Sequence, residues 1–171
     1  MVVEPAPDVL EILVASLSRR FNAYITCAKD AGTCLECELT DPHEVLIAEL
    51  ELEGSSGLHL AEQVLSLGPR PVILIGDRIT SAAAIAAMRI GVRDLFRKPF
   101  AVTALLDSAE RALRAHREWV RRAARYHRLR ELVRQAVRDR RDLNRRVDLV
   151  CKDLVEAHRR LARRVAEVKA T

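Results

Sequence analysis

Residues 44–58 read EVLIAELELEGSSGL and combine a strand pattern with a turn and the start of a helix. Residues 45–48 form a short unbroken apolar run, which is typical of a strand buried on both faces of a parallel sheet. The run ends at Glu49, and a Gly/Ser-rich turn then leads into an apolar helical segment that begins at Gly57. Open α/β sheets place their ligand sites at the carboxyl ends of the strands, so Glu49 stands where such a site is expected.

The sequence on either side of this stretch alternates expected strands with expected helices. Strands are expected over residues 9–15, 34–39, 44–49, 71–76 and 92–96, and helices over residues 16–31, 57–67 and 82–90, the last capped by Thr80 or Ser81. The PVILIG run at 71–76 is the strongest strand signal, because it is β-branched, uncharged and begins with a proline. Only TDPHE separates the second strand from the third, so the second helix is expected to be missing or reduced. This alternation predicts an α/β protein with a five-stranded parallel sheet, helices on both faces and right-handed crossovers.

The sequence changes character after Pro99. Residues 101–168 contain neither Gly nor Pro, and apolar residues recur at the a and d positions of a heptad, which predicts a coiled coil. The expected dimer seam consists of Trp119, Tyr126, Leu129, Val133, Leu143, Val147, Val150, Leu154 and Leu161. A helix of roughly 65 residues would be about 100 Å long, too long to bury its seam against one small domain. It must pair with another chain or fold back, and we expect a homodimer whose helices run either parallel or antiparallel.

Charge divides the chain into two parts. Residues 1–100 carry nine Lys/Arg and fourteen Asp/Glu, a net charge of −5, while residues 101–171 carry twenty and ten, a net charge of +10. We therefore predict one α/β domain over residues 1–112 and a basic helical coiled coil over residues 113–171, continuous with the last helix of the domain.

Several classes of protein are not favoured. No stretch approaches the roughly 18 to 20 apolar residues needed to cross a bilayer, and the acidic N-terminal segment argues against a signal peptide, so we expect a cytoplasmic protein with no membrane partner. Cys34 and Cys37 form a C-x-x-C pair, with Cys27 and His43 nearby in the sequence. In an expected strand the pair would face opposite sides, so reduced structural thiols are favoured over a zinc or redox site.

Residues 9 to about 112 resemble the receiver domain of two-component response regulators. The resemblance rests on EVLIAE at 44–49, Gly57 eight residues after Glu49, PVILIG at 71–76, and FRKPF at 96–100. It implies a flavodoxin-like sheet of order 2-1-3-4-5. In that family an Asp at the end of the third strand accepts a phosphoryl group, and a Lys-Pro pair follows the fifth strand.

The residues that perform this chemistry are largely altered. Glu49 stands at the phospho-accepting Asp, and Gly76 stands where the family has a Thr or Ser. Leu95, with Phe96 beside it, stands at the aromatic switch position. Of the positions that matter to the switch, only Lys98 is retained.

The acidic pair that follows the first strand and holds Mg²⁺ in the family matches Ala15 and Ser16, if the first strand covers residues 9–15. Phosphoryl transfer to a carboxylate requires Mg²⁺ surrounded by several oxygen ligands. The resemblance therefore implies a pseudo-receiver that is not phosphorylated and that uses no metal or other cofactor.

Two interpretations of Glu49 remain open. In the first, Glu49 forms a fixed ion pair with Lys98, and its longer side chain partly imitates the reach and charge of a phosphorylated Asp. In the second, Glu49 is a solvated carboxylate at the end of a strand.

The favoured function is a phosphorylation-independent signalling or scaffold protein that acts through coiled-coil dimerisation and contacts with other signalling proteins. In receiver families the face formed by the fourth helix, fifth strand and fifth helix carries many contacts. The expected partner surface therefore contains Met88, Arg89, Leu95 and Phe96.

The alternative is a regulator similar to antiterminators that binds nucleic acid through the Arg-rich C-terminal helix. It is not favoured, because the same arginines can pair with acidic residues three or four positions away. An enzyme is not expected, since no phosphate-binding glycine loop, nucleophile elbow or metal quartet is present in the sequence.

Overall fold

The computed structural model describes residues 1–169, with side chains described as far as Leu161 and at Arg163. Contacts divide the chain into residues 1–120 and the residues from Arg121 onward. Positions 170 and 171 of the expected basic helix lie outside the described residues. The predicted domain boundary at residue 112 stays a prediction, because one helix continues through both parts.

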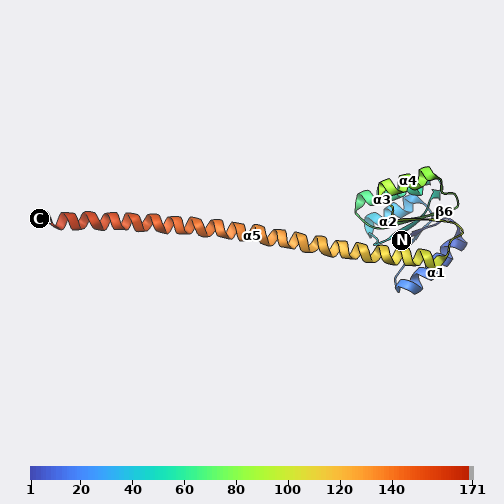
Figure 1. The fold of residues 1–171 in the computed structure, drawn as a ribbon, viewed down its shortest axis with the longest axis horizontal. Coiled ribbons are helices and arrows are strands. Elements are labelled where there is room, and N and C mark those ends of the chain that lie inside the picture. The colour runs from blue at the N-terminus through green and yellow to red at the C-terminus, as the bar shows by residue number, and fades with distance from the viewer. Residues whose placement is uncertain (170–171) are drawn as a thin grey trace. The chain divides into compact units, whose positions relative to one another are not determined.

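Five parallel strands form the central sheet of the first unit (Figure 1). In spatial order they are β2 (Cys27–Ala28), β1 (Val2–Val3), β3 (Leu46–Glu49), β6 (Val72–Gly76) and β7 (Asp94–Arg97). A separate antiparallel pair, β4 (Glu51–Leu52) and β5 (Ser55–Ser56), follows β3. Counting only the strands of the main sheet, this is the order 2-1-3-4-5, so the predicted flavodoxin-like fold is confirmed.

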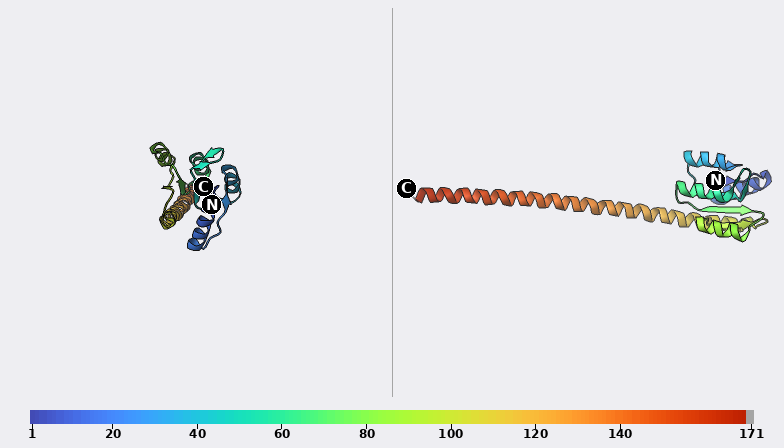
Figure 2. Two further views of the ribbon diagram at one scale, coloured as in Figure 1. Left: turned by 90° about the vertical axis from the view of Figure 1, so that its right-hand side faces the viewer. Right: turned by 90° about the horizontal axis from the view of Figure 1, so that it is seen from above.

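Helices cover both faces of the sheet (Figures 1 and 2). The helices are α1 (Pro7–Phe21), α2 (Ala31–Thr40), α3 (Gly57–Leu67), α4 (Ser81–Ile90) and α5 (Val102–Lys169). Helices α2, α3 and α4 enclose one apolar core with Leu46, Ala48 and Leu74. Helix α1 and the first turns of α5 enclose the other core with Ile47, Ile73 and Ile75. Successive residues of β3 and β6 thus face opposite layers, as the pleat of a strand requires.

The strand expected over residues 9–15 is wrong, because these residues belong to helix α1. Leu13 and Leu17 are buried one helical turn apart, which is the spacing of a helix that covers a sheet with one face. Pro7 occupies the first helical position, and the helix ends at Asn22 in a left-handed conformation. The helix expected over 16–31 therefore stops at Phe21, and the true first strand is the two-residue β1.

The strand expected over residues 34–39 is also wrong, because this segment forms helix α2. The Asp30 side chain caps the helix by accepting a hydrogen bond from the Thr33 amide at 2.8 Å. Cys34 and Glu38 lie one turn apart and are both buried. A second helix of ten residues is therefore present, and the expectation that it could be missing is overturned.

The helices and strands expected in the middle of the chain agree with the structure. Helix α3 spans residues 57–67 as predicted, and helix α4 spans 81–90 with Thr80 as its cap and Gly91 after its end. Strands β3 and β6 lie within the predicted ranges, and β7 is shifted toward Arg97. Within the described residues, no helix is long and apolar enough to cross a membrane.

Candidate functional site

Three strands deliver charged side chains to the carboxyl edge of the sheet. Glu4 follows β1, Glu49 is the last residue of β3, and Lys98 follows β7 in a cis peptide bond with Pro99. Strands β1 and β3 are neighbours with Val3 opposite Ala48, so the two glutamates leave the sheet side by side. These three strands thus bring two carboxylates and one ammonium together at this edge.

The three groups form one compact cluster, which is called the Glu4–Lys98–Glu49 cluster below. The Lys98 ammonium lies 2.5 Å from Glu49 Oε2 in an ion pair, and it donates a hydrogen bond to Glu4 Oε2 at 2.9 Å. Glu4 and Glu49 are buried, and the Lys98 side chain is 16% exposed. The ion pair that the sequence suggested between Glu49 and Lys98 is therefore present in the structure.

Backbone amides hold the remaining carboxylate oxygens. Glu49 Oε1 accepts hydrogen bonds from the amides of Leu50 at 2.9 Å and Glu51 at 3.3 Å. Glu4 Oε1 accepts one from the amide of Ala6 at 3.0 Å. Glu49 Oε2 is buried and meets Lys98 outside hydrogen-bond geometry, so the ammonium is the group that compensates its charge.

Burial and charge act in opposite directions on this cluster. Burial raises the pKa of Glu49 above its ordinary value, and the contacts with Lys98 and the Glu51 amide only partly offset that rise. Burial opposes the charged form of Lys98, but its contacts with Glu49 and Glu4 outweigh burial and raise the pKa of Lys98. An ammonium between two carboxylates is thus held firmly in its charged form.

Two glycines allow the backbone to close around Glu49. A Cβ on Gly57 would lie 2.1 Å from the Glu49 carbonyl oxygen, and the Gly57 amide donates to the Leu50 carbonyl at 2.8 Å. A Cβ on Gly76 would lie 2.9 Å from Leu50 Cβ and 3.2 Å from Glu49 Oε1. The place where a side chain at position 76 would stand is therefore already filled by Leu50 and Glu49.

Ala15 and Ser16 do not belong to this site, and their assignment was wrong because the first strand was misplaced. Both lie on helix α1. The residues that follow the true first strand are Glu4 and Pro5. Glu4 was missed because a strand of two residues leaves no periodic signal in the sequence.

The four residues of the expected partner surface are not gathered on one face. Met88 is 78% exposed and Arg89 is exposed, both on α4. Leu95 packs against the core under α2, α3 and α4, whereas Phe96 packs against the core under α1 and α5. Phe96 also contacts Phe100, with their ring centroids 5.8 Å apart. The surface thus reduces to the exposed side of α4, and its role in binding stays a prediction.

The nine residues of the expected dimer seam all lie on α5, and each is more than half exposed in the single chain.

Of the four cysteines, Cys34 is buried on α2, and burial raises the pKa of its thiol to about 12. No group of three or more possible metal-ligating side chains occurs among the described residues.

Comparison with known proteins agrees with the fold. No family model matches the chain. The chain is 28% identical over 114 residues to the transcriptional regulatory protein KdpE of Mycobacterium tuberculosis, which covers 67% of this chain and 50% of that protein. It is also similar to the receiver domain of NtrX from Brucella abortus, with 28% identity and a TM-score of 0.61 over 66% of this chain and 96% of that one. The fold is that of a response-regulator receiver domain.

A CheY-like receiver domain from Methanospirillum hungatei has the same fold, with a TM-score of 0.64 and 18% identity over 68% of this chain and 94% of that one. The chain spans about half the length of KdpE, so the activity of that whole protein is not carried over. The similarity supports a signalling role for the receiver domain.

The acidic pair that holds Mg²⁺ in active receiver domains corresponds here to Glu4 and Pro5. Pro5 offers no side-chain oxygen, and the Glu4 and Glu49 carboxylates are engaged by backbone amides and by Lys98. Mg²⁺ requires near-octahedral coordination by free oxygen ligands. The residues of the Glu4–Lys98–Glu49 cluster therefore do not fit a Mg²⁺ ion in the receiver manner.

Proposed function

We propose that this chain is a non-enzymatic, phosphorylation-independent receiver protein that dimerises through α5 and signals through contacts with other proteins. The observation that carries the proposal is the Glu4–Lys98–Glu49 cluster. In it, the carboxylate at the phospho-acceptor position is buried and already paired with Lys98.

Three features make this site a poor phosphoryl acceptor. Glu49 Oε1 is held by two amides, and Oε2 lies against the Lys98 ammonium. The second member of the acidic pair is Pro5, and position 76 has neither a hydroxyl nor space for one. Phosphoryl transfer depends on positioned cations around the transferred group, so each of these features removes part of the required machinery.

The same cluster supports a receiver domain that is held in one conformation without phosphorylation, which is called a permanently set domain below. Glu49 places a negative charge against Lys98 without any modification, and it is one methylene longer than the Asp it replaces. We infer that Glu49 holds the carboxyl edge of the sheet in one arrangement, which α4 and α5 then present to a partner.

The exposed seam on α5 supports dimerisation. The seam recurs at heptad positions from Trp119 to Leu161, and within one chain nothing that the structure describes covers it. A second copy would bury the same residues in a coiled coil. Arg140 at one seam position would weaken the pairing locally and favour a single register.

Nucleic-acid binding is the second candidate, and a stripe on α5 favours it. Basic residues recur every seven positions at Arg138, Arg145, Lys152 and Arg159, on the helix face opposite the seam, and all four are exposed. Arg138 and Arg145 make exposed ion pairs with Glu131 and Asp142, and such pairs contribute little. The stripe is therefore compatible with phosphate contacts by a dimer whose seam is already buried.

Two measurements test the proposal. The first compares the full chain with Glu49→Gln and Glu49→Asp in sedimentation equilibrium and in capture of partner proteins from cell extract. Glu49→Gln, which removes the charge, is expected to alter partner capture while leaving dimerisation by α5 intact. If both variants behave as the wild type does, the permanently set domain is refuted.

The second measurement is the electrophoretic mobility of duplex DNA and of single-stranded RNA with the full chain at low and physiological salt. The favoured function predicts no shift at physiological salt. A shift that weakens steeply with salt and is lost when Arg138, Arg145, Lys152 and Arg159 are replaced by Gln would establish the second candidate instead.

A further inference from the structure

A pocket of about 330 Å³ lies at the amino edge of the sheet, between α1, α5 and the loops that precede β2 and β3. Its apolar wall includes Leu17 and Phe21 of α1, Ile25 before β2, and Leu113 of α5. His43 and Arg117 supply polar walls. The volume falls at the lower end of the range for small-molecule sites, which are mostly apolar with a few placed polar groups.

This pocket is separate from the Glu4–Lys98–Glu49 cluster. Val45 and Ile47 line the pocket from the amino end of β3, whereas Glu49 ends the same strand at the carboxyl edge. No residue of the cluster lines the pocket, and nothing in the receiver chemistry described above uses it. A ligand here would therefore occupy a second site.

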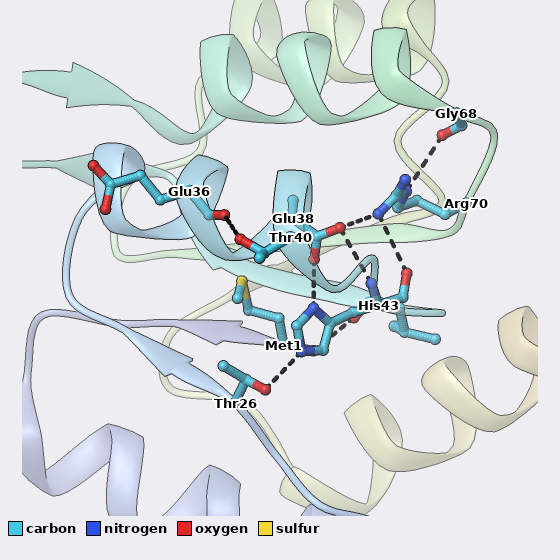
Figure 3. A network of polar contacts seen from close by, with 9 residues as sticks. Met1, Thr26, Glu36, Glu38, Thr40, His43, Gly68 and Arg70 are labelled. Atoms are coloured by element: carbon cyan, nitrogen blue, oxygen red, sulfur yellow. Dashed lines mark hydrogen bonds and ion pairs between the residues drawn. The ribbon is translucent and has the colours of Figure 1, made fainter.

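A buried polar network fixes His43 in the pocket wall (Figure 3). The Glu38 side chain is fully buried and contacts both the Arg70 guanidinium and His43 Nδ1, the latter at 2.8 Å. His43 Nε2 lies 2.6 Å from Thr26 Oγ1. Since both ring nitrogens are engaged within the protein, the ring is held rigidly and offers the pocket an aromatic surface rather than a free donor.

Arg117 and Glu44 form a forked ion pair beside the pocket. Arg117 Nε lies 2.8 Å from Glu44 Oε1, and Arg117 Nη2 lies 2.5 Å from Glu44 Oε2. Both side chains are about half exposed, 52% and 54%, so the pair is screened by water and weak. Arg117 projects from a helix, whereas Glu44 lies in the connection between α2 and β3 and can turn toward solvent.

We propose that this pocket binds a small aromatic carboxylate. The flat ring packs among Leu17, Phe21, Leu113 and the fixed His43 ring, and the ligand carboxylate takes the place of Glu44 on the Arg117 guanidinium. A guanidinium fork matches a carboxylate in a bidentate geometry, so the exchange keeps two charge-assisted hydrogen bonds while burying the ring.

The test uses ¹H–¹⁵N correlation spectra of the full chain titrated with benzoate and with indole-3-acetate at up to millimolar concentration. Benzamide and indole-3-acetamide are the neutral counterparts, and octanoate is the aliphatic one. Saturable shifts confined to the pocket residues are expected with both aromatic carboxylates, and affinity is expected to fall by about tenfold or more for the amides and for octanoate.

Two variants complete the test. Arg117→Gln is expected to weaken benzoate and indole-3-acetate binding by about tenfold, while Arg114→Gln, on the same helix but outside the pocket, leaves binding unchanged. The proposal is overturned if no probe gives saturable shifts, if amides or octanoate bind as well as the aromatic carboxylates, or if Arg117→Gln binds as the wild type does. Shifts of the same residues with protein concentration alone would assign the pocket to a second copy and would overturn it equally.

Discussion

The ammonium nitrogen of Lys98 lies 2.5 Å from Oε2 of Glu49, at the edge of the sheet where a receiver domain is phosphorylated. The lysine that follows the last strand and the acid that ends the third strand are thus joined without a phosphoryl group between them. Glu4 accepts a hydrogen bond from the same ammonium at 2.9 Å and makes the arrangement a three-membered cluster. The proposal that an unmodified site is held in one conformation rests on this relationship.

Lys98→Met is expected to destabilise the domain by on the order of 2 kcal/mol, because it leaves two buried carboxylates facing each other without a cation. The value is below that of a fully buried pair, since the Lys98 side chain is partly exposed. Urea unfolding measures the change. Arg78→Met is the matched control. Arg78 is 84% exposed, and its ion pair with Glu51 is long, at 3.9 Å, so its loss is expected to leave stability unchanged. Equal effects of the two variants would contradict the role given to Lys98.

Protonation of Glu49 is expected to make the stability of the domain depend on pH. Burial raises the pKa of Glu49 in the folded state above its ordinary value of 4.5, so the folded state binds this proton more tightly than the unfolded state does. The favourable contribution of Glu49 is therefore present below pH 4.5 and is lost as pH rises through the raised folded pKa.

This contribution is isolated by comparing the free energy of unfolding of the wild type with that of Glu49→Gln across the pH range. The wild type is expected to lose stability relative to Glu49→Gln as pH rises above 4.5. The pKa of Lys98 is raised above 10.5, so its contribution is retained at neutral pH and lost only in strong alkali. A difference between wild type and Glu49→Gln that grows more favourable to the wild type above pH 4.5 would refute the assignment.

Gly76→Ala is expected to cost about 1–3 kcal/mol, because its Cβ would approach Leu50 Cβ to 2.9 Å in a packed edge. Adding Leu50→Gly, which removes the Leu50 Cβ, should relieve the contact, so the double variant is expected to be less destabilised than the sum of the two single variants. Thermal unfolding of the four proteins in this cycle gives the coupling. Strict additivity would show that Leu50 does not fill the place of a side chain at position 76.

Leu143→Glu is expected to dissociate the dimer, because it places a charge in the middle of the seam of α5. Leu149→Glu provides a close control: both leucines are 60% exposed in the single chain, but Leu149 lies outside the a and d positions. Sedimentation equilibrium is expected to show a monomer for Leu143→Glu and a dimer for Leu149→Glu. A monomeric wild type, or equal effects of the two variants, would contradict the predicted coiled-coil dimer.

The sequence correctly predicted the elements that local patterns of apolar and turn residues define. Strands β3 and β6 are continuous apolar runs, and helix α3 has both helical spacing and a Gly-Pro stop, so these elements were placed well. Strands β1 and β2 have only two residues each, and neighbouring strands define them by pairing. The run at 9–15 was therefore taken for the first strand, although it belongs to α1, where Leu13 is its one buried residue.

The same error hid part of the site. Glu49 and Lys98 were identified because Glu49 ends one recognisable strand and Lys98 follows another, but Glu4 could be found only once β1 was placed. The contact between Glu38 and Arg70 joins positions 32 residues apart, and no local pattern marks it. Tertiary contacts of this kind determine the cluster at one edge of the sheet and the pocket at the other.

Whether Glu49 accepts a phosphoryl group is tested directly by the intact mass of the full chain after incubation with Mg²⁺ and acetyl phosphate, compared with that of Glu49→Gln. A carboxylate already held by Lys98 and two backbone amides, at a site that does not fit Mg²⁺, should not accept a phosphoryl group. The wild type is therefore expected to keep its unmodified mass. A phosphoryl adduct that forms on the wild type and is absent from Glu49→Gln would contradict it.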